Sequence, residues 1–549
     1  MKRSTAFPIH PPTPEFLRLE GSIRALSTAI YRIQAQCEFS GPPSSDTIAS
    51  VDEERAIVYG QISTLLTTGV GSLVGRQQIA VTGGSSHRGF FINVTEVVAC
   101  HSDTFLEPAV VQLSQCLPSQ KTLKQLAEDR RPLSDITLAE HAGDVLQALH
   151  LISQDIYAKD RRLLECFIAR RCHPEISRRL NCAVSLLDPP LHEVLNKWEL
   201  HPNDHLREDW IVIPYPLILL ESFCIPHRPS TRWPDRRELL FNRQTFGVWK
   251  KFFVSLLQVV SSTVAAFEPE QTESAADLVL ALHFLRLFFS FGPARTMLGI
   301  ASLRPILLQS LSPEHQVDLL TIVDHELQVK SPVDIICRTW AAVVAYDVAI
   351  TSLVSRHSAA LFILRHSVPS VHIIHAPSRK TSKIMDSIPR IMHTKVLPAL
   401  KLNKHHADVV EALISEHLTV ADFPGHVHCE AALMGVAYVF SSEDRPVKES
   451  VSWAKNLPAF YDAFEGHSNA IGHDGDQSCQ ICSWLSEELL LSNGHFTLQG
   501  SSRSSAKTIP WSPPRFGIPL HILRNLESEL LDLLIDSTQG WLQQKTRGI

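Results

Sequence analysis

Residues 425–439 read GHVHCEAALMGVAYV, and residues 478–491 read SCQICSWLSEELLL. In both segments a polar or turn-forming start is followed by apolar residues at helical spacing, so each predicts the beginning of a helix. His428 stands at the first of these starts, and Cys479 and Cys482 stand three positions apart at the second. Imidazole and thiolate groups are the ligands that zinc prefers. The pair of segments therefore predicts a Zn²⁺ site with His428, Cys479 and Cys482 as its ligands.

Three protein ligands leave the fourth position of zinc open, which is the arrangement of a catalytic site. Glu430 is expected to move protons rather than bind the metal. Residues two apart do not share a helix face, so His428 and Glu430 can serve one site only if the metal lies off the starting end of the helix. Ser478 is the expected N-cap of the second helix. The positive end of that helix would favour the thiolate form of both cysteines.

Other interpretations of these residues remain open. The chain has 27 histidines, and His173-Pro174-Glu175 repeats the H-x-E spacing of residues 428–430. The C-x-x-C spacing occurs once, but 11 cysteines give a fair chance of an accidental match. The zinc could be structural, the site could have lost its activity, or the cysteines could pack as small apolar residues. His426 is a rival ligand, and Cys429 is expected to be a small buried residue.

The composition is that of a folded protein with several domains. The chain has 549 residues, 44% of them hydrophobic and 20% charged, and a net charge of −6. This charge gives no overall attraction to nucleic acid. The first residues have no apolar segment of a secretory signal, and no run of 18 apolar residues predicts a membrane span. The scattered cysteines are typical of a reducing compartment, so we expect an intracellular protein, cytoplasmic or nuclear, that is not secreted and has no membrane partner.

The chain divides by pattern at about residue 330. Residues 1–329 predict a helical region of unknown role, with apolar residues at helical spacing over 16–36, 145–157, 248–267 and 276–291. Residues 330–549 mix β-rich runs at 359–366 and 370–377 with helical stretches at 379–400, 404–417 and 519–543. We therefore expect an α+α/β chain, in which a helical N-terminal region precedes a C-terminal α/β domain.

The H-C-E and C-x-x-C segments, together with GSSRSSAKTIPWSPP at 500–514, resemble the cytidine-deaminase-like superfamily. The similarity is to its fungal clade, which is related to bacterial toxin-type deaminases, and it covers about the last 200 residues. The resemblance implies a three-layer α/β/α domain at 330–549 with zinc between two helix starts. It also implies His428, Cys479 and Cys482 as ligands and Glu430 as the proton shuttle.

The function implied is zinc-dependent hydrolytic deamination of a cytosine- or adenine-type base. The base would be part of a nucleoside, a nucleotide or single-stranded nucleic acid, and no protein partner is indicated. The alternative is a non-enzymatic interaction or scaffold protein that keeps its zinc for folding. Lys507, Trp511 and Arg515 are candidate substrate-binding residues, because cationic and aromatic side chains together suit a nucleotide. A polar loop in contact with solvent is the other interpretation of that stretch.

Two features depart from the family pattern. Ser478 stands where proline commonly precedes the first cysteine, and the segment GHDGDQS at 472–478 is acidic. Asp474 and Asp476 are expected near the mouth of the site, where they would disfavour a polyanionic substrate. This favours a nucleoside, a nucleotide or a short single strand over duplex DNA.

Overall fold

The computed structural model of the chain describes residues 4–8, 13–35, 51–69, 79–86, 89–100, 110–116, 119–154, 160–206, 208–213, 225–230, 237–290, 293–312, 332–355, 368–379, 387–419, 425–440, 458–474, 478–492, 496–499 and 508–547. Three features singled out in the sequence lie outside the described residues. They are the expected strand at 359–366 and the residues Asp476 and Lys507.

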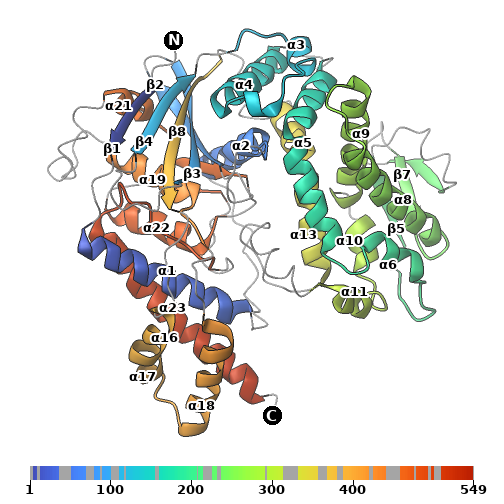
Figure 1. The fold of residues 1–549 in the computed structure, drawn as a ribbon. Coiled ribbons are helices and arrows are strands. Elements are labelled where there is room, and N and C mark those ends of the chain that lie inside the picture. Colours follow the sequence, from blue (N-terminus) through green and yellow to red (C-terminus); the bar gives the residue numbers. More distant parts are fainter. Residues whose placement is uncertain are drawn as a thin grey trace.

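A seven-stranded mixed sheet lies at the centre of the fold (Figure 1). Across the sheet, its strands are β1 (Ser4–Pro8), β4 (Val110–Cys116), β8 (Ser370–Arg379), β3 (Gly89–Cys100), β2 (Ile79–Ser86), β9 (Ala470–His473) and β10 (Thr497–Leu498). The β8–β3 and β9–β10 pairs are parallel, and the other neighbours are antiparallel. The sheet thus joins strands from before residue 117 with strands from after residue 369.

The sheet separates two hydrophobic cores. Successive side chains of a strand point to opposite faces, and the buried residues of the central strands follow this rule. Ile373 packs in the core on one face, and Ile374 packs in the core on the other. Ala470 and Ile471 divide in the same way on β9. Both faces are therefore covered, so these strands read as apolar runs rather than as an alternation of apolar and polar residues.

One face carries the helices from the two ends of the chain and from the region after residue 387. They are α1 (Pro14–Ala35), α16 (Ser387–Ile391), η2 (Met392–Val396), α17 (Leu397–Leu400), α18 (Lys404–Leu413), η3 (Ile414–Leu418), α19 (Cys429–Phe440), α21 (Pro458–Phe464), α22 (Gln480–Leu491) and α23 (Leu520–Arg547). In Figure 1, α1 and α23 run side by side, and the pairs Arg18–Glu527 and Arg524–Glu15 join them. The expected final helix at 519–543 is confirmed as α23.

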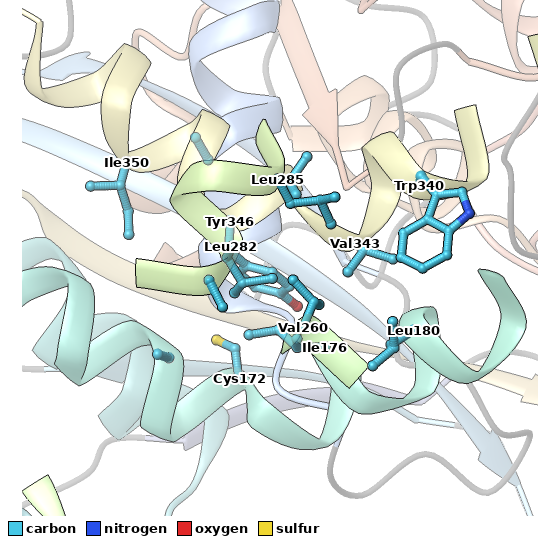
Figure 2. Close-up of a cluster of buried hydrophobic side chains, with 14 of the residues drawn as sticks. Cys172, Ile176, Leu180, Val260, Leu282, Leu285, Trp340, Val343, Tyr346 and Ile350 are labelled. Atoms are coloured by element: carbon cyan, nitrogen blue, oxygen red, sulfur yellow. The ribbon is translucent and has the colours of Figure 1, made fainter. Parts of the chain in front are cut away.

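The core on the other face extends from the sheet into the helices of the middle of the chain, most of which lie beside the sheet in Figure 1. They are α2 (Val51–Leu66), α3 (Leu123–Ala127), α4 (Leu138–Gln154), α5 (Arg161–Ser185), α6 (Leu191–Lys197), α8 (Phe246–Ala265), α9 (Thr272–Ser290), α10 (Pro293–Leu298), α11 (Arg304–Ser310), α13 (Pro332–Val343) and α14 (Ala345–Val354), with the short turn η1 (Leu133–Asp135). Figure 2 shows part of their core, where Ile176 of α5, Leu282 of α9 and Tyr346 of α14 come together. The helices expected within 1–329 are confirmed as α1, α4, α8 and α9.

The interpretation of residues 1–329 as helical is wrong for β1, β2, β3 and β4, whose strands all lie within that range. The expected boundary at 330 also differs from what is observed: α13 and α14 follow it but pack with α5 and α9, and the sheet has strands from both sides of it. A strand with both faces buried lacks the period-two signal that separates strands from helices in a sequence. Residues 79–83 of β2 and 91–95 of β3 are such cases.

A second, three-stranded sheet lies within the helical part. It contains β5 (Asp209–Ile213), β7 (Arg237–Phe241) and β6 (His227–Pro229) in that order, and both pairs are antiparallel. Among the described helices, none combines the length and the apolar character that crossing a membrane requires. The chain as a whole is therefore a mixed α and β protein, as the sequence predicts at that coarse level.

Candidate metal centre

His428, Cys479 and Cys482 come together although 51 residues separate the histidine from the nearer cysteine in the sequence. Their ligand atoms all lie within 4.8 Å of one another, and all three side chains are buried. His428 Nδ1 and Cys482 Sγ lie 3.6 Å apart. Tetrahedral zinc with N and S ligands sets such separations at about 3.5–3.8 Å. The donors therefore need to close by roughly an ångström at most to hold a metal ion.

Cys479 begins α22 as its N-cap residue. Its backbone is extended, at φ −67° and ψ 153°, and its sulfur accepts the N–H of Cys482 at 3.2 Å. The expectation that Ser478 is the cap is wrong, because the Ser478 hydroxyl instead donates to Gln499 O at 3.2 Å. A sulfur atom at the N-cap lies at the positive end of the helix, which favours the thiolate. The cap itself is therefore one of the candidate ligands.

His428 immediately precedes α19 and accepts the N–H of Ala432 with its carbonyl oxygen at 3.0 Å. It thus occupies the starting end of this helix, as the joint use of His428 and Glu430 requires. The rest of α19 is buried on nearly all sides, which an apolar helix in a core should be. His426 is not in the donor group. His426 lies beside the segment that contains Trp511. The backbone N–H of Ser512 donates a hydrogen bond to His426 O at 3.0 Å.

Glu430 is 3% exposed and has two polar neighbours that the sequence interpretation did not identify. His473 Nε2 lies 3.7 Å from Glu430 Oε1, a pair that is ionic when the imidazole is protonated. The thiol of Cys429 donates to Glu430 Oε2 at 3.3 Å. Cys429 is buried, as expected, but it also contacts the carboxylate. The signal for His473 was its place at the end of a short apolar run six residues before Cys479.

The electrostatics of the pocket fit a cation. Burial raises the pKa of the Cys482 thiol well above its ordinary value of 9.0, and the neighbouring Cys479 and Glu430 raise it further. A metal ion would reverse this cost, because thiolates are the ionised form that metals bind. Two thiols with one imidazole form a soft donor set that suits a transition metal rather than Mg²⁺ or Ca²⁺. The buried group of His428, Cys479 and Cys482 could therefore hold a metal ion.

Trp511 and Arg515 have packing roles. The ring of Trp511 is completely buried, and its backbone N–H donates to Ser27 Oγ at 3.0 Å. Its indole lies close enough to lower the pKa of Cys482, although no hydrogen bond of good geometry reaches its N–H among the described residues. Arg515 donates to Glu20 of α1 at 2.8 Å. The Arg515 side chain is 15% exposed, and the third candidate, Lys507, lies outside the described residues.

The expected position of Asp474 at the mouth of the site is wrong. Its carboxylate is buried and lies 3.3 Å from Arg179 Nη2 of α5, and Thr67 Oγ1 donates to it at 3.5 Å. The charge of Asp474 is thus compensated inside the protein. The position of Asp474 therefore gives no information about the charge of a substrate.

The second H-x-E triplet is structural. His173 stacks on Phe267 with ring centroids 4.0 Å apart, and its Nε2 lies 3.0 Å from Val264 O. Glu175 is paired with Arg178 and Arg179. Neither residue belongs to a described group that could hold a metal.

Comparison with family models, with curated proteins and with solved structures finds no match to this chain.

Proposed function

We propose that this chain is a zinc-dependent hydrolytic deaminase that acts on a cytosine- or adenine-type base. The position of Glu430 carries the proposal. This carboxylate lies in the first turn of α19, two residues after a candidate ligand, and is not part of the donor group. Its charge nevertheless acts on Cys482. A structural zinc site has no use for such a carboxylate, whereas a hydrolytic site needs a group that moves protons.

The surroundings of the donors support this proposal. His428 and Cys479 begin two helices, α19 and α22, that pack in the same core on the same face of the sheet. This is the arrangement implied by the resemblance to the cytidine-deaminase-like superfamily. The finer assignment of an α/β/α deaminase domain belongs to the same proposal. Its sheet would include β2 and β3, so the domain would begin well before residue 330.

The residues divide the work as follows. Zinc, held by His428, Cys479 and Cys482, would supply a Lewis acid that acidifies water. Glu430 would take one proton from the attacking water and deliver it to the ring nitrogen, and it would then move the second proton, from the added hydroxyl, to the leaving amine. His473 and Cys429, each within hydrogen-bond or ion-pair range of one carboxylate oxygen, would hold Glu430 in place. Water adds to the amidine carbon, ammonia leaves, and a carbonyl product remains.

The burial of the site favours a small substrate. His428 and Glu430 are 3% exposed and both cysteines are fully buried, so a base would have to enter an enclosed space. A free nucleoside or nucleotide, or a base at a flexible single strand, can do so more readily than a base in duplex DNA. Extracting a base from a duplex costs a few kcal/mol. The net charge of −6 points in the same direction.

The same burial favours a second candidate function. Donors that are 0–3% exposed are typical of a closed structural zinc site, in which the metal contributes only to folding. In that case the chain would be a non-enzymatic interaction or scaffold protein. The two candidates differ in what Glu430 does. Only the deaminase needs its carboxylate chemistry.

The test compares Glu430→Gln with the wild-type chain and with Glu416→Gln, a change at an exposed glutamate. Zinc-loaded proteins are incubated with cytidine, adenosine, their monophosphates, single strands and duplexes, and ammonia and product mass are measured. We expect Glu430→Gln to keep its zinc and lose at least about 100-fold in activity, while Glu416→Gln behaves as wild type. Absence of activity in the zinc-loaded wild type on all these substrates would favour the structural function. Loss of zinc by Glu430→Gln would contradict the assigned role.

A further inference from the structure

The segment of residues 508–512 joins the two helix starts of the candidate metal centre. Thr508 Oγ1 donates to Gln480 Oε1 at 2.9 Å, in the first turn of α22 and between the two cysteines. Toward its other end, the backbone of Trp511 pairs with that of His426, two residues before the candidate histidine ligand. The segment therefore lies across the starts of both α19 and α22.

The helix α1 holds this segment in place from a third direction. The backbone N–H of Trp511 donates to Ser27 Oγ at 3.0 Å. The next residue, Ser512, accepts the Nε–H of Arg24 at 3.0 Å, and both side chains are buried. The backbone that carries the indole of Trp511 is thus fixed by buried hydrogen bonds.

The indole N–H of Trp511 is a buried donor that no acceptor among the described residues meets at ordinary hydrogen-bond geometry. Such a donor costs free energy and calls for an explanation. The group on which it acts is Cys482. Burial raises the pKa of the Cys482 thiol, as do Cys479 and Glu430, whereas a hydrogen bond from the Trp511 side chain lowers it. A thiol is only a weak acceptor, but an ionised acceptor forms stronger and shorter hydrogen bonds.

The two candidate sulfur ligands would each have one N–H donor in this arrangement. Cys479 Sγ accepts the backbone N–H of Cys482 at 3.2 Å, and the indole N–H of Trp511 is the corresponding donor for Cys482. Groups that contact the ligands of a metal, rather than the metal itself, orient those ligands and tune their charge. We infer that Trp511 is a positioning residue of the metal centre, whose indole N–H donates to the Cys482 thiolate when a metal ion is bound. The inference rests on the metal binding of the proposed function and not on its deaminase activity.

The test compares the wild type with Trp511→Phe, which removes the N–H and keeps an aromatic ring. Trp541→Phe is the matched control, because Trp541 of α23 lies in the same core, is 5% exposed and has a buried N–H with no described acceptor. Competition with a chromophoric chelator measures the affinity of the full-length chain for Zn²⁺. We expect Trp511→Phe to bind zinc about 10–100-fold more weakly, and Trp541→Phe to bind it as the wild type does.

Cobalt(II) in place of zinc gives a readout that a loss of packing alone would not change. A hydrogen bond to a thiolate lowers the energy of its lone-pair electrons and so raises the energy of charge transfer from sulfur to cobalt. This absorption band should therefore lie at longer wavelength in Trp511→Phe and at the wild-type position in Trp541→Phe. Unchanged affinity and band position in Trp511→Phe, or the same changes in Trp541→Phe, would overturn the inference.

Thermal unfolding with and without zinc separates the inferred bond from packing. If Trp511 only fills space, Trp511→Phe should lower the melting temperature equally in both states, and that result would contradict the inference. The inferred bond requires a larger fall in the zinc-bound protein, because the thiolate that accepts the N–H exists mainly there.

Nuclear magnetic resonance of the wild type tests the inference without any substitution. The chain has nine tryptophans, and one of their indole N–H signals should shift downfield when zinc is added to the metal-free protein. If none shifts, the inference is wrong, including the case in which Trp511→Phe does not fold. A wild type that binds neither zinc nor cobalt would contradict the metal centre and this inference with it. A chain that shows these metal effects but has no deaminase activity would support the inference and contradict the deaminase proposal alone.

Discussion

Arg179 Nη2 and Asp474 Oδ2 lie 3.3 Å apart, and both side chains are buried. Arg179 belongs to α5 of the helical part, and Asp474 follows directly after β9, the strand that precedes α22 and its two candidate ligands. Arg179 also donates to Glu175 at 2.9 Å and lies over the ring of Tyr346. A single buried cation thus links the helical part to the strand that precedes the cysteines.

Arg179→Met should lower the free energy of unfolding by about 3–5 kcal/mol, because it leaves the carboxylates of Glu175 and Asp474 buried without their shared cation. Chemical denaturation of the full-length chain measures this loss. Lys197→Met is the control, since Lys197 forms an exposed pair with Glu193 and should change stability by less than about 1 kcal/mol. Equal effects of the two substitutions would show that the buried link does not contribute to stability.

The stability of the chain should depend on the ionisation of Glu175 in acid. Burial alone raises the pKa of this carboxyl, but the hydrogen bond of Arg178 and the charge of Arg179 lower it from 4.5 to about 2. Because the pKa of Glu175 is lower in the folded state, its ionised carboxylate stabilises the folded protein above pH 4.5. This contribution is lost as the pH falls toward 2. The contribution is on the order of 3 kcal/mol. Glu175→Gln should therefore flatten the fall in unfolding free energy over this range, and an unchanged slope would contradict the assignment.

Gly472→Ala and Gly540→Ala should have opposite effects on stability. A Cβ at Gly472 of β9 would overlap the backbone of α2 at Gly60 and Ala56, which cannot move aside cheaply. We expect a loss of about 2 kcal/mol or more. Gly540 lies in α23 with open space around its Cβ position, so alanine there should stabilise by about 0.5–1 kcal/mol. Thermal unfolding of both variants measures whether each substitution lowers or raises the stability. An unchanged stability of Gly472→Ala would contradict the close packing of α2 on β9.

The amount of bound zinc should depend on His428, Cys479 and Cys482, and not on other nearby cysteines or histidines. Cys479→Ser and Cys482→Ser should reduce bound zinc to well below one equivalent and destabilise the chain, because metal binding is coupled to folding. His426→Ala and Cys429→Ala are controls that flank His428 and should keep the metal. Elemental analysis after dialysis measures the content, and alkylation after chelation reports whether both cysteines become reactive. Loss of zinc in His426→Ala would assign the imidazole ligand to His426.

The candidate metal centre was predictable from sequence because its signals are local. His428, Cys479 and Cys482 lie at helix starts, and each start has an apolar helical pattern behind it. The exact cap was not predictable, since Ser478 and Cys479 both offer an acceptor and the choice depends on where Gln499 lies. The contact of His473 with Glu430 arises only when β9 and α19 pack together, whereas the contact of Cys429 with Glu430 lies within α19 itself.

The arrangement of the sheet was not predictable from local patterns. The parallel pairing of β3 with β8 joins residues that lie about 280 positions apart, and no periodicity records such a pairing. Asp474 was misplaced for the same reason, because its partner Arg179 is 295 residues away. Local spacing identifies helices and helix starts well, whereas strand partners and ion-pair partners depend on the tertiary fold.

The distribution of the sheet along the chain has a consequence for biosynthesis. The strands β2, β3 and β4 lie within residues 79–116, but their later partners β8 and β9, and β10 beside β9, follow only at residues 370–498. At roughly 5–20 residues per second, the ribosome needs roughly 20 to 80 s between Cys116 and Thr497. During that time the apolar faces of the early strands lack their final neighbours, and the pair of cysteines does not yet exist. The candidate metal centre can therefore form only after the cysteines of α22 have been made, long after the early strands.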